Sequence, residues 1–285
     1  MSESPRDTPF RPVDPERLGV ASGHAEVDPA KPSPARMYDY YLGGKDNFES
    51  DRVAAEEIYT QIPDLPEIAR DNRGMMQRAV RYLAAKGITQ FVDIGAGLPT
   101  QGNVHEIAQG VNPAARIVYA DNDPIVLAHA RALLTSSAEG ETRYLDADLR
   151  DPESIFENPV LHEIIDLEKP VGLILVAVLH FITEDADPYD LLARYRAYLP
   201  KGSYVVLAHA SRQDMPEAAW RKMEAVYARS SAPFVFRDRT QVTRLFDGME
   251  LVEPGLVYCP EWRPEPGTPR SRSAAWNFGG VGYVG

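Results

Sequence analysis

The possible folds of this chain are narrowed first by an apolar strand that runs directly into a glycine turn. Residues 88–94 have the pattern of a buried strand, and Gly95, Ala96 and Gly97 follow at once. The two glycines let the backbone turn tightly and bring its N–H groups close to a ligand. Ligands of open α/β sheets bind at the carboxyl ends of strands, where the strand order reverses. Residues 91–100 therefore predict a nucleoside-binding turn.

Alternating strands and helices follow this turn. Apolar segments predict strands at 116–120, 142–145, 171–179 and 203–208, separated by helices at 103–109, 125–134 and 188–198. The run 171–179 is apolar without alternation, which indicates a strand covered on both faces. This order of elements is typical of a mostly parallel, doubly wound α/β sheet. Two later strands, at 251–258 and 274–283, are expected to close the sheet at an antiparallel edge.

Composition restricts the partners and the compartment. With 30 basic and 42 acidic residues, the chain carries a net charge of −12 and has no general attraction for nucleic acid or anionic lipid. The single cysteine excludes an intramolecular disulfide, and no two histidines have metal-ligand spacing, so no metal is expected. The longest apolar run, 171–179, is shorter than the roughly 20 residues of a membrane-spanning helix. Residues 1–15 lack the apolar core of a secretory signal, so we expect a cytoplasmic protein.

Acidic side chains stand at the ends of three successive predicted strands. Asp121 comes 24 residues after Gly97, near the offset of about 20 residues at which a carboxylate binds ribose hydroxyls. Asp148 is placed to accept a hydrogen bond from an adenine amino group, with the Leu149 N–H beside the ring. Asp93 would repel a pyrophosphate but suits the amino group of a methionine tail.

These features favour S-adenosylmethionine over a dinucleotide. The dinucleotide fingerprint has a third glycine or alanine where this chain has Thr100. No cluster of Lys or Arg accompanies the carboxylates, which suits a cationic nucleoside without phosphates. NAD also uses a carboxylate in the place of Asp121, so that residue alone does not discriminate between the two ligands.

More specific patterns lie in eight segments: 34–47, 91–100, 104–108, 119–124, 148–152, 178–181, 253–255 and 262–264. Together they closely resemble a bacterial family of S-adenosylmethionine-dependent methyltransferases that was formerly catalogued as a domain of unknown function. The resemblance covers nearly all of the chain from residue 34 onward. It implies a class I methyltransferase fold, with a seven-stranded, mostly parallel, doubly wound α/β sheet and an N-terminal helical lid. It implies no particular methyl acceptor.

Twelve residues are expected to contact S-adenosylmethionine: Asp93, Gly95, Ala96, Gly97, Thr100, Asp121, Asn122, Asp148, Leu149, Tyr41, Arg73 and His105. Tyr41 belongs to an aromatic segment expected to close over the cofactor, because tyrosine rings exclude water and attract a sulfonium. Arg73 is a candidate partner for the methionine carboxylate, with an ordinary solvated arginine as the alternative. His105 lies on the helix after the turn, where its alternative is a bond to a neighbouring backbone carbonyl.

Two histidines end the fourth and fifth predicted strands, where a methyl acceptor should lie beside the sulfonium. His180 is the candidate general base and His209 a weaker one, because an imidazole with a reference pKa near 6.5 accepts a proton at neutral pH. The alternative for each is a packing or capping role. Methyl transfer asks the protein mainly to align the acceptor and to remove a proton.

The chain is expected to form one methyltransferase domain over residues 35–285, preceded by a flexible, proline-rich arm over 1–34. Within the domain, we expect a helical cap at 35–86 and a cofactor-binding core at 87–210. Residues 211–285 are expected to supply acceptor-side helices and the closing strands.

The sequence therefore predicts an S-adenosylmethionine-dependent methyltransferase that acts on a small-molecule acceptor. Because a fold does not decide chemistry, a non-catalytic protein that binds S-adenosylmethionine for regulation is one alternative. An NAD-dependent oxidoreductase is the second. The sequence specifies neither the acceptor nor the oligomeric state.

Overall fold

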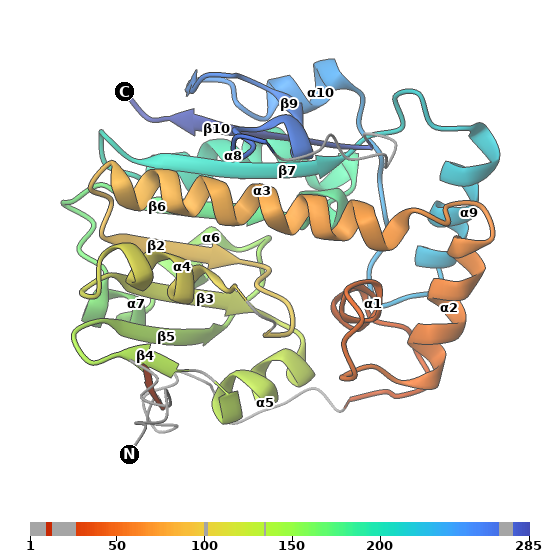
Figure 1. The fold of residues 1–285 in the computed structure, drawn as a ribbon, viewed down its shortest axis with the longest axis horizontal. Helices are drawn as coiled ribbons and strands as arrows, with labels where there is room; N and C mark the ends of the chain where they lie inside the picture. Colours follow the sequence, from red (N-terminus) through yellow and green to blue (C-terminus); the bar gives the residue numbers. More distant parts are fainter. Residues whose placement is uncertain (1–9, 13–26, 100–101, 134, 268–275) are drawn as a thin grey trace.

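The computed structural model describes residues 10–12, 27–99, 102–133, 135–267 and 276–285. Its main sheet has eight strands, seven of them in one continuous path (Figure 1). The path runs β5 (Glu141–Asp146), β3 (Arg116–Asp121), β2 (Gln90–Ile94), β6 (Gly172–Val176), β7 (Tyr204–Ala210), β10 (Asn277–Tyr283) and β8 (Glu250–Leu251). The first five strands are parallel and β10 is antiparallel to its neighbours. The predicted mostly parallel, doubly wound sheet is confirmed.

The eighth strand, which lies off this path, comes from a segment that was expected to form one continuous strand. The single strand predicted over 251–258 is wrong, because this segment forms β8 and the separate strand β9 (Val257–Tyr258), which pairs with β10. Between them, Pro254 has no backbone N–H to give to a sheet and Gly255 has a φ of 84°. Both residues favour a turn over a continued strand.

Alternate residues of each central strand serve two separate hydrophobic cores. On β2, Phe91 packs with α3 (Leu65–Ala85), α4 (Val104–Val111) and α5 (Pro124–Leu133). Its neighbour Val92 packs on the opposite face with α6 (Pro152–Phe156), α7 (Pro159–Ile164), α8 (Pro188–Ala197) and α10 (Arg239–Arg244). The period of two in a strand explains this division, and each fully buried side chain of this kind contributes about 1.5–3 kcal/mol.

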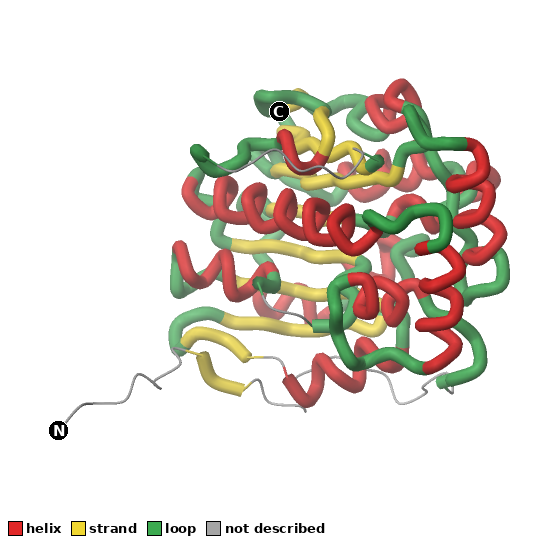
Figure 2. Tube along the Cα trace, turned by 45° about the vertical axis from the view of Figure 1, so that its right-hand side comes forward, coloured by secondary structure: helices red, strands yellow, loops and turns green. Residues whose placement is uncertain are grey.

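Three helices lie beyond the carboxyl ends of the parallel strands, at the right of Figure 1. They are α1 (Pro34–Tyr41), α2 (Glu49–Tyr59) and α9 (Glu217–Tyr227), from distant parts of the sequence. Their apolar faces form a third cluster, which includes Met37, Ile58 and Met223. Figure 2 shows from a second direction that these helices stand across the strand ends. They close the edge of the sheet at which ligands of this fold bind.

A short strand lies within the segment that the sequence assigned to a flexible arm. Residues Phe10–Pro12 form β1, which pairs antiparallel with β4 (Thr135–Ser137) in a separate two-stranded sheet. Farther along, the Ser33 side chain is buried against the rest of the chain. Part of residues 1–34 therefore has defined partners.

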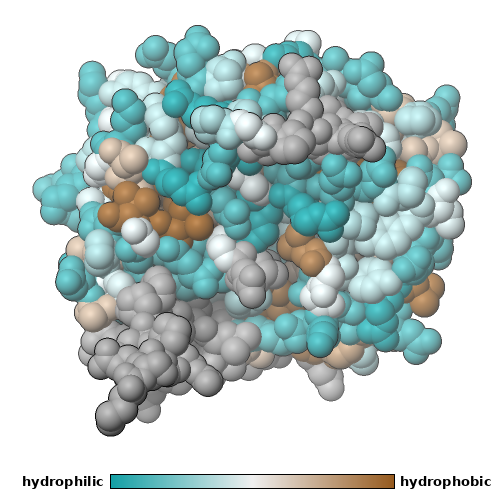
Figure 3. Space-filling model, in the orientation of Figure 1, coloured by the Kyte–Doolittle hydropathy of each residue, from teal (hydrophilic) through white to brown (hydrophobic). Residues whose placement is uncertain are grey.

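The visible surface in Figure 3 is mostly hydrophilic, with small hydrophobic patches. Among the described residues, the large apolar side chains that are exposed are Phe48, Val53 and Val111. No helix in the described ranges is both long and apolar enough to cross a membrane. In the same ranges, no three His, Cys, Asp or Glu side chains are grouped so that they could hold a metal ion.

Candidate active site

A cavity of about 470 Å³ lies at the carboxyl ends of the parallel strands. Its volume is within the range of pockets that hold small ligands, about 300–1,000 Å³. Eleven residues predicted from the sequence line it: Tyr41, Arg73, Asp93, Gly95, Ala96, Gly97, Asp121, Asn122, Asp148, Leu149 and His180. Thr100, also predicted, lies outside the described residues. His105 and His209 are not among the residues that line the cavity.

The glycine turn after β2 forms one wall of the cavity, and both of its glycines are needed. Gly95 has a φ of 70°, and a Cβ there would lie 2.3 Å from Val178. Gly97 has a φ of 65° and open space where a Cβ would be. These backbone angles strongly favour glycine, and the open side at Gly97 leaves room for a ligand to approach the main chain.

Asp121, at the end of β3, is oriented by two backbone donors. The Gly97 N–H donates to Oδ2 and the Asp123 N–H donates to Oδ1, both at 2.9 Å. A carboxylate has about four acceptor positions, so acceptor capacity remains for hydroxyl groups of a ligand. Burial raises the pKa of Asp121 to about 6. The side chain is thus fixed in direction and short of compensating positive charge.

Asp93 and Arg73 form a second polar site in the cavity wall. Asp93 lies at the end of β2, and burial raises its pKa to about 7, with the negative charge of Asp121 adding to the shift. The Arg73 guanidinium acts in the opposite direction on the same pKa. Arg73 also donates to the Asn103 side chain at 2.8 Å. Because the two side chains have opposite charges, they suit the ammonium and the carboxylate of an amino acid.

Asp148 has a partner that the sequence analysis missed. Arg150, two residues away, binds both oxygens of its carboxylate and also donates its backbone N–H at 2.8 Å. These hydrogen bonds lower the pKa of Asp148, and Arg150 itself lines the cavity. Asp148 is therefore paired with one arginine, which the sequence analysis did not identify. The signal was the short Asp-Leu-Arg spacing after β5.

His180 belongs to a 3₁₀ turn, Leu179–Phe181, that follows β6. Its ring stacks on Phe234, with centroids 4.3 Å apart, and meets Phe181 edge-on at 4.5 Å. Nδ1 is buried without a hydrogen-bond partner among the described residues. Burial lowers the pKa of His180 well below its usual range, and nearby His209 and Arg237 lower it further. The imidazole is therefore neutral at physiological pH and is a weaker base than the sequence suggested.

His209 and His105 are both packed away from the cavity. The Arg237 guanidinium lies 2.8 Å from Nε2 of His209 and can only donate a hydrogen bond, so Nε2 is the acceptor. Nδ1 therefore carries the proton and donates a hydrogen bond to the Ala210 carbonyl oxygen at 2.7 Å. Both ring nitrogens are thus used within the protein, which favours the packing role that was the alternative for His209. The His105 ring bonds the Tyr119 hydroxyl at 2.9 Å behind the sheet. Its place on the inner face of α4 does not support a cofactor contact.

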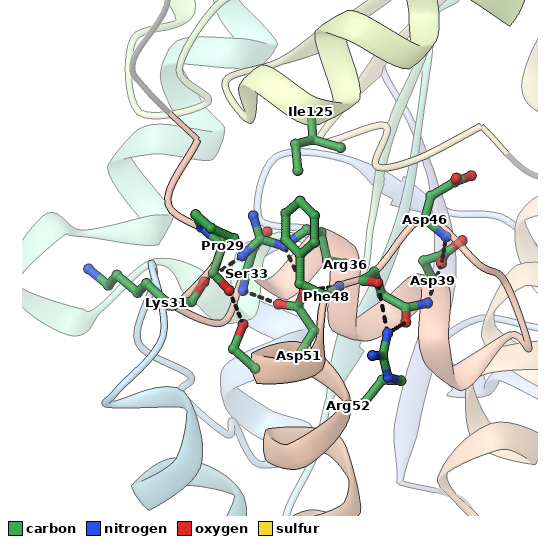
Figure 4. A network of polar contacts seen from close by, with 12 residues as sticks. Pro29, Lys31, Ser33, Arg36, Asp39, Asp46, Phe48, Asp51, Arg52 and Ile125 are labelled. Carbon is green, nitrogen blue, oxygen red and sulfur yellow. Dashed lines mark hydrogen bonds and ion pairs between the residues drawn. The ribbon is translucent and has the colours of Figure 1, made fainter.

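A buried polar network holds the first two helices over the site (Figure 4). Arg36 of α1 and Asp51 of α2 form an ion pair at 2.7 Å, with side chains 4% and 0% exposed. Asp51 also accepts the backbone N–H groups of Ser33 and Phe48, at 2.9 and 2.8 Å. The Ser33 hydroxyl donates to Asp123 at 2.5 Å, which connects this network to the loop after β3.

The far side of the cavity is apolar and mainly aromatic, and sequence reasoning identified little of it. We call it the apolar half. Its residues come from α1, the α2–α3 region, α9 and the loops around them: Tyr41, Ile62, Leu65, Phe181, Met215, Met223, Tyr227, Phe234, Phe236 and Trp276. Residues 210–240 carry no motif, so only the Phe-Val-Phe pattern at 234–236 was available as a signal.

Comparison with known proteins shows which family this chain belongs to. Residues 21–285 match the family described as S-adenosyl methyltransferase. The chain belongs to that family. A solved protein of the DUF574 family from Streptomyces avermitilis is 38% identical over 91% of this chain and 100% of its own, with a TM-score of 0.86. A proposed methyltransferase from Thermobifida fusca is 40% identical over 89% of this chain and 95% of its own, with a TM-score of 0.81. A search of the curated proteins gives no match.

The cavity fits the cofactor of an S-adenosyl methyltransferase. S-adenosylmethionine has an amino acid end, a sulfonium and an adenosine, and the wall offers charged groups for the amino acid and hydrogen-bonding groups for the adenosine. The open side of Gly97 and the oriented carboxylate of Asp121 suit the ribose, and Asp93 with Arg73 suits the amino acid. Family membership replaces the alternative of an NAD-dependent oxidoreductase.

Proposed function

We propose that this S-adenosyl methyltransferase transfers a methyl group to a small molecule held in the apolar half of the cavity. The observation that carries the proposal is the continuity of the site: one cavity joins the acidic strand ends to the apolar half, with His180 between the fourth strand and that half. The acceptor can therefore lie next to the cofactor. The cavity of about 470 Å³ limits the acceptor to a small molecule.

Each part of the cofactor has a proposed partner. Asp121 accepts hydrogen bonds from the ribose hydroxyls, and Asn122 lies beside it. Asp148 and the Leu149 N–H meet the adenine. Asp93 binds the amino group and Arg73 the carboxylate of the methionine. Support comes from the position of these residues in one cavity wall and from the directed carboxylate of Asp121.

The residues of the chain then act mainly by alignment and by excluding water. S-adenosylmethionine supplies the electrophilic methyl group on a sulfonium. Helix α1, with Tyr41, lines the site, and α2 is held to α1 by the Arg36–Asp51 ion pair; the two helices are the proposed lid. Exclusion of water strengthens the electrostatic interactions inside the cavity. His180, the imidazole exposed to the cavity, is proposed to hydrogen-bond the acceptor and to receive its proton.

The proposal is tested first by ligand binding. We expect calorimetry to show binding of S-adenosylmethionine and S-adenosylhomocysteine, and no comparable binding of NAD. Asp121→Ala should weaken the affinity for S-adenosylhomocysteine by tenfold or more, about 1.4 kcal/mol, because the ribose loses charge-assisted hydrogen bonds. Asp190→Ala, at an exposed position on α8, is the matched control and should bind normally.

A second measurement tests turnover. Incubation with S-adenosylmethionine labelled in the methyl group and a mixture of small-molecule extracts should give a labelled product that is separable from the protein. Normal affinity in the Asp121→Ala variant would contradict the proposed ribose site. Tighter binding of NAD than of either adenosyl compound would contradict the function.

A further inference from the structure

The charged side chains that line the cavity lie mostly near the carboxyl ends of the parallel strands. Among the described lining residues, they are Asp39, Arg73, Asp93, Asp121, Asp123, Asp148 and Arg150. Two lie at the ends of β2 and β3, three follow β3 or β5, and Arg73 acts on Asp93. Asp39, on α1, is already held by the Asp46 N–H at 2.9 Å and by Asn47 at 2.8 Å. An ammonium or carboxylate group placed in the apolar half would lose its hydration and gain no opposite charge, which is strongly unfavourable.

The wall of the apolar half is built from aromatic rings in mutual contact. Phe234 stacks on His180, and its centroid lies 4.9 Å from both Tyr227 and Phe236. Phe181 meets Phe234 edge-on at 5.6 Å. Rings that are arranged in this way offer both faces and edges, and aromatic guests gain from such contacts beyond the area that they bury. A flat ring system is therefore the framework that this wall fits best.

The polar groups in the apolar half are neutral and can both donate and accept hydrogen bonds. The hydroxyls of Tyr41 and Tyr227 lie 3.3 Å apart and are both buried. Because one of the two hydroxyls donates to the other, the pair keeps one donor and spare acceptor positions. The Trp276 Nε1 is buried without a partner among the described residues. A neutral hydroxyl group on the guest matches these requirements.

The proton that the acceptor loses also limits its identity. His180 is the imidazole next to this part of the cavity, and its lowered pKa makes it a weak base. A hydroxyl on an aromatic ring ionises near pH 10, as in tyrosine, whereas an aliphatic hydroxyl is far less acidic. A weak base therefore favours a phenol over an alcohol.

We propose that the acceptor is an uncharged aromatic molecule, methylated on a phenolic hydroxyl in the apolar half. This inference rests on the proposed function. The phenolic oxygen forms a bond to the methyl carbon while the methyl–sulfur bond breaks. The electron pair of that bond stays on sulfur, which becomes a neutral thioether. The electrons of the O–H bond stay on the oxygen, and the proton passes to the ring of His180 and then to water.

Binding to the complex with S-adenosylhomocysteine tests this inference separately from the proposed function. The probes are 2-naphthol, 4-phenylphenol, the saturated alcohol decahydro-2-naphthol, the anion 6-hydroxy-2-naphthoate and the cation 2-naphthylmethylammonium. In calorimetry, we expect both neutral phenols to bind at least about tenfold more tightly than either ion. With labelled S-adenosylmethionine, 2-naphthol should be methylated on oxygen and decahydro-2-naphthol should not.

A charge placed in the apolar half should reverse the preference. Met215 lines this half and is 9% exposed. Met215→Lys should strengthen the binding of 6-hydroxy-2-naphthoate about tenfold and weaken that of 2-naphthylmethylammonium, with affinity for S-adenosylhomocysteine unchanged. Met223→Lys, on α9, is a second variant of the same kind. Val53→Lys adds the same charge at an exposed position of α2 and should change neither affinity.

The outcomes separate two failures. If S-adenosylhomocysteine does not bind, the proposed function fails. If it binds, but the ions bind as tightly as the neutral phenols or the phenols do not bind, the assignment of the acceptor class is overturned. Equal methylation of the phenol and the saturated alcohol also overturns it.

Discussion

Two carboxylates, the half-buried Asp93 and the buried Asp121, make the site both a binding surface and a source of instability. Asp93 and Asp121 have pKa values raised to about 7 and about 6, chiefly by burial. In an unfolded chain both titrate near 4. The folded protein therefore holds protons that the unfolded chain releases, and the stability that this provides is lost as the pH rises through 6 and 7. A cationic ligand bound beside these carboxylates should restore the stability that is lost when they ionise.

The first prediction concerns Asp93. In the protein without ligand, Asp93→Asn should raise the melting temperature by a few °C at pH 8, because the variant has no buried charge to ionise. At pH 5 the difference should be smaller, because Asp93 is protonated in the folded protein and the penalty has only begun to grow above the unfolded pKa near 4. The same variant should bind S-adenosylmethionine at least about tenfold more weakly at pH 8. Thermal denaturation and calorimetry at both pH values check this, and a lower melting temperature at pH 8 would contradict it.

The second prediction separates the two histidines. His209→Ala removes the acceptor of the buried Arg237 donor, so it should cost about 1–3 kcal/mol of stability and leave the affinity for S-adenosylhomocysteine unchanged. His180→Ala should leave cofactor affinity intact and lower the rate of methyl transfer. Denaturant unfolding, calorimetry and a methyl-transfer assay distinguish the roles. Loss of transfer in a stable His209→Ala protein would show that His209 is catalytic.

What the sequence could predict at this scale depended on local geometry. Asp93, Asp121 and Asp148 follow parallel strands, whose carboxyl ends meet at one edge, so chain position alone brought them together. The bond of His105 to Tyr119 could not be predicted, because the face that a helical residue presents depends on how α4 packs on the sheet. Phe234 came from a loop whose path is fixed by contacts distant in the sequence.

At the scale of elements, the sheet could be predicted from the pattern of apolar segments. The packing of α1 on α2 depends instead on a buried ion pair. The strands were predictable because short apolar segments without alternation, such as residues 171–179, are typical of strands that are covered on both faces of a sheet. The exception was 251–258, where Pro254 and Gly255 outweighed the apolar pattern. The packing of α1 and α2 was not predictable, because Arg36 and Asp51 are 15 residues apart and carry no periodic signal.

The third prediction tests that ion pair. Asp51→Ala leaves the Arg36 charge buried and the Ser33 and Phe48 N–H groups without their acceptor, so it should destabilise the protein by about 3–5 kcal/mol. Because Ser33 also bonds Asp123, cofactor affinity should fall as well. Glu217→Ala breaks an exposed ion pair with Arg221 and should cost less than about 1 kcal/mol. Equal effects of the two variants in denaturant unfolding would refute the structural role.

For the whole molecule, the cavity joins parts of the chain that are far apart in sequence. Its walls include residues near positions 35, 95, 180, 230 and 276, drawn from the core, the cap and the closing strand. A ligand in the cavity therefore contacts several separate elements at once. Its binding energy should be shared by the cap and the sheet.

The fourth prediction follows from that arrangement. S-adenosylhomocysteine at about 100 times its dissociation constant should stabilise the protein by about 2.7 kcal/mol. Hydrogen exchange should slow in α1 and at the ends of β2 and β3, which line the cavity, and also in α2, because the Arg36–Asp51 ion pair ties α2 to α1. Exchange measured by mass spectrometry, with and without the ligand, checks this. Protection limited to the strand ends would show that the cap does not respond to the cofactor.

The raised pKa values of Asp93 and Asp121 also couple cofactor binding to the release of protons. Below pH 7, these carboxyl groups are partly protonated, and a bound ammonium favours their ionised form. Binding near pH 6 should therefore expel protons into the medium. Calorimetric enthalpies measured in two buffers with different heats of ionisation should differ in proportion to the protons released. This difference should shrink toward pH 8, where both side chains have already ionised.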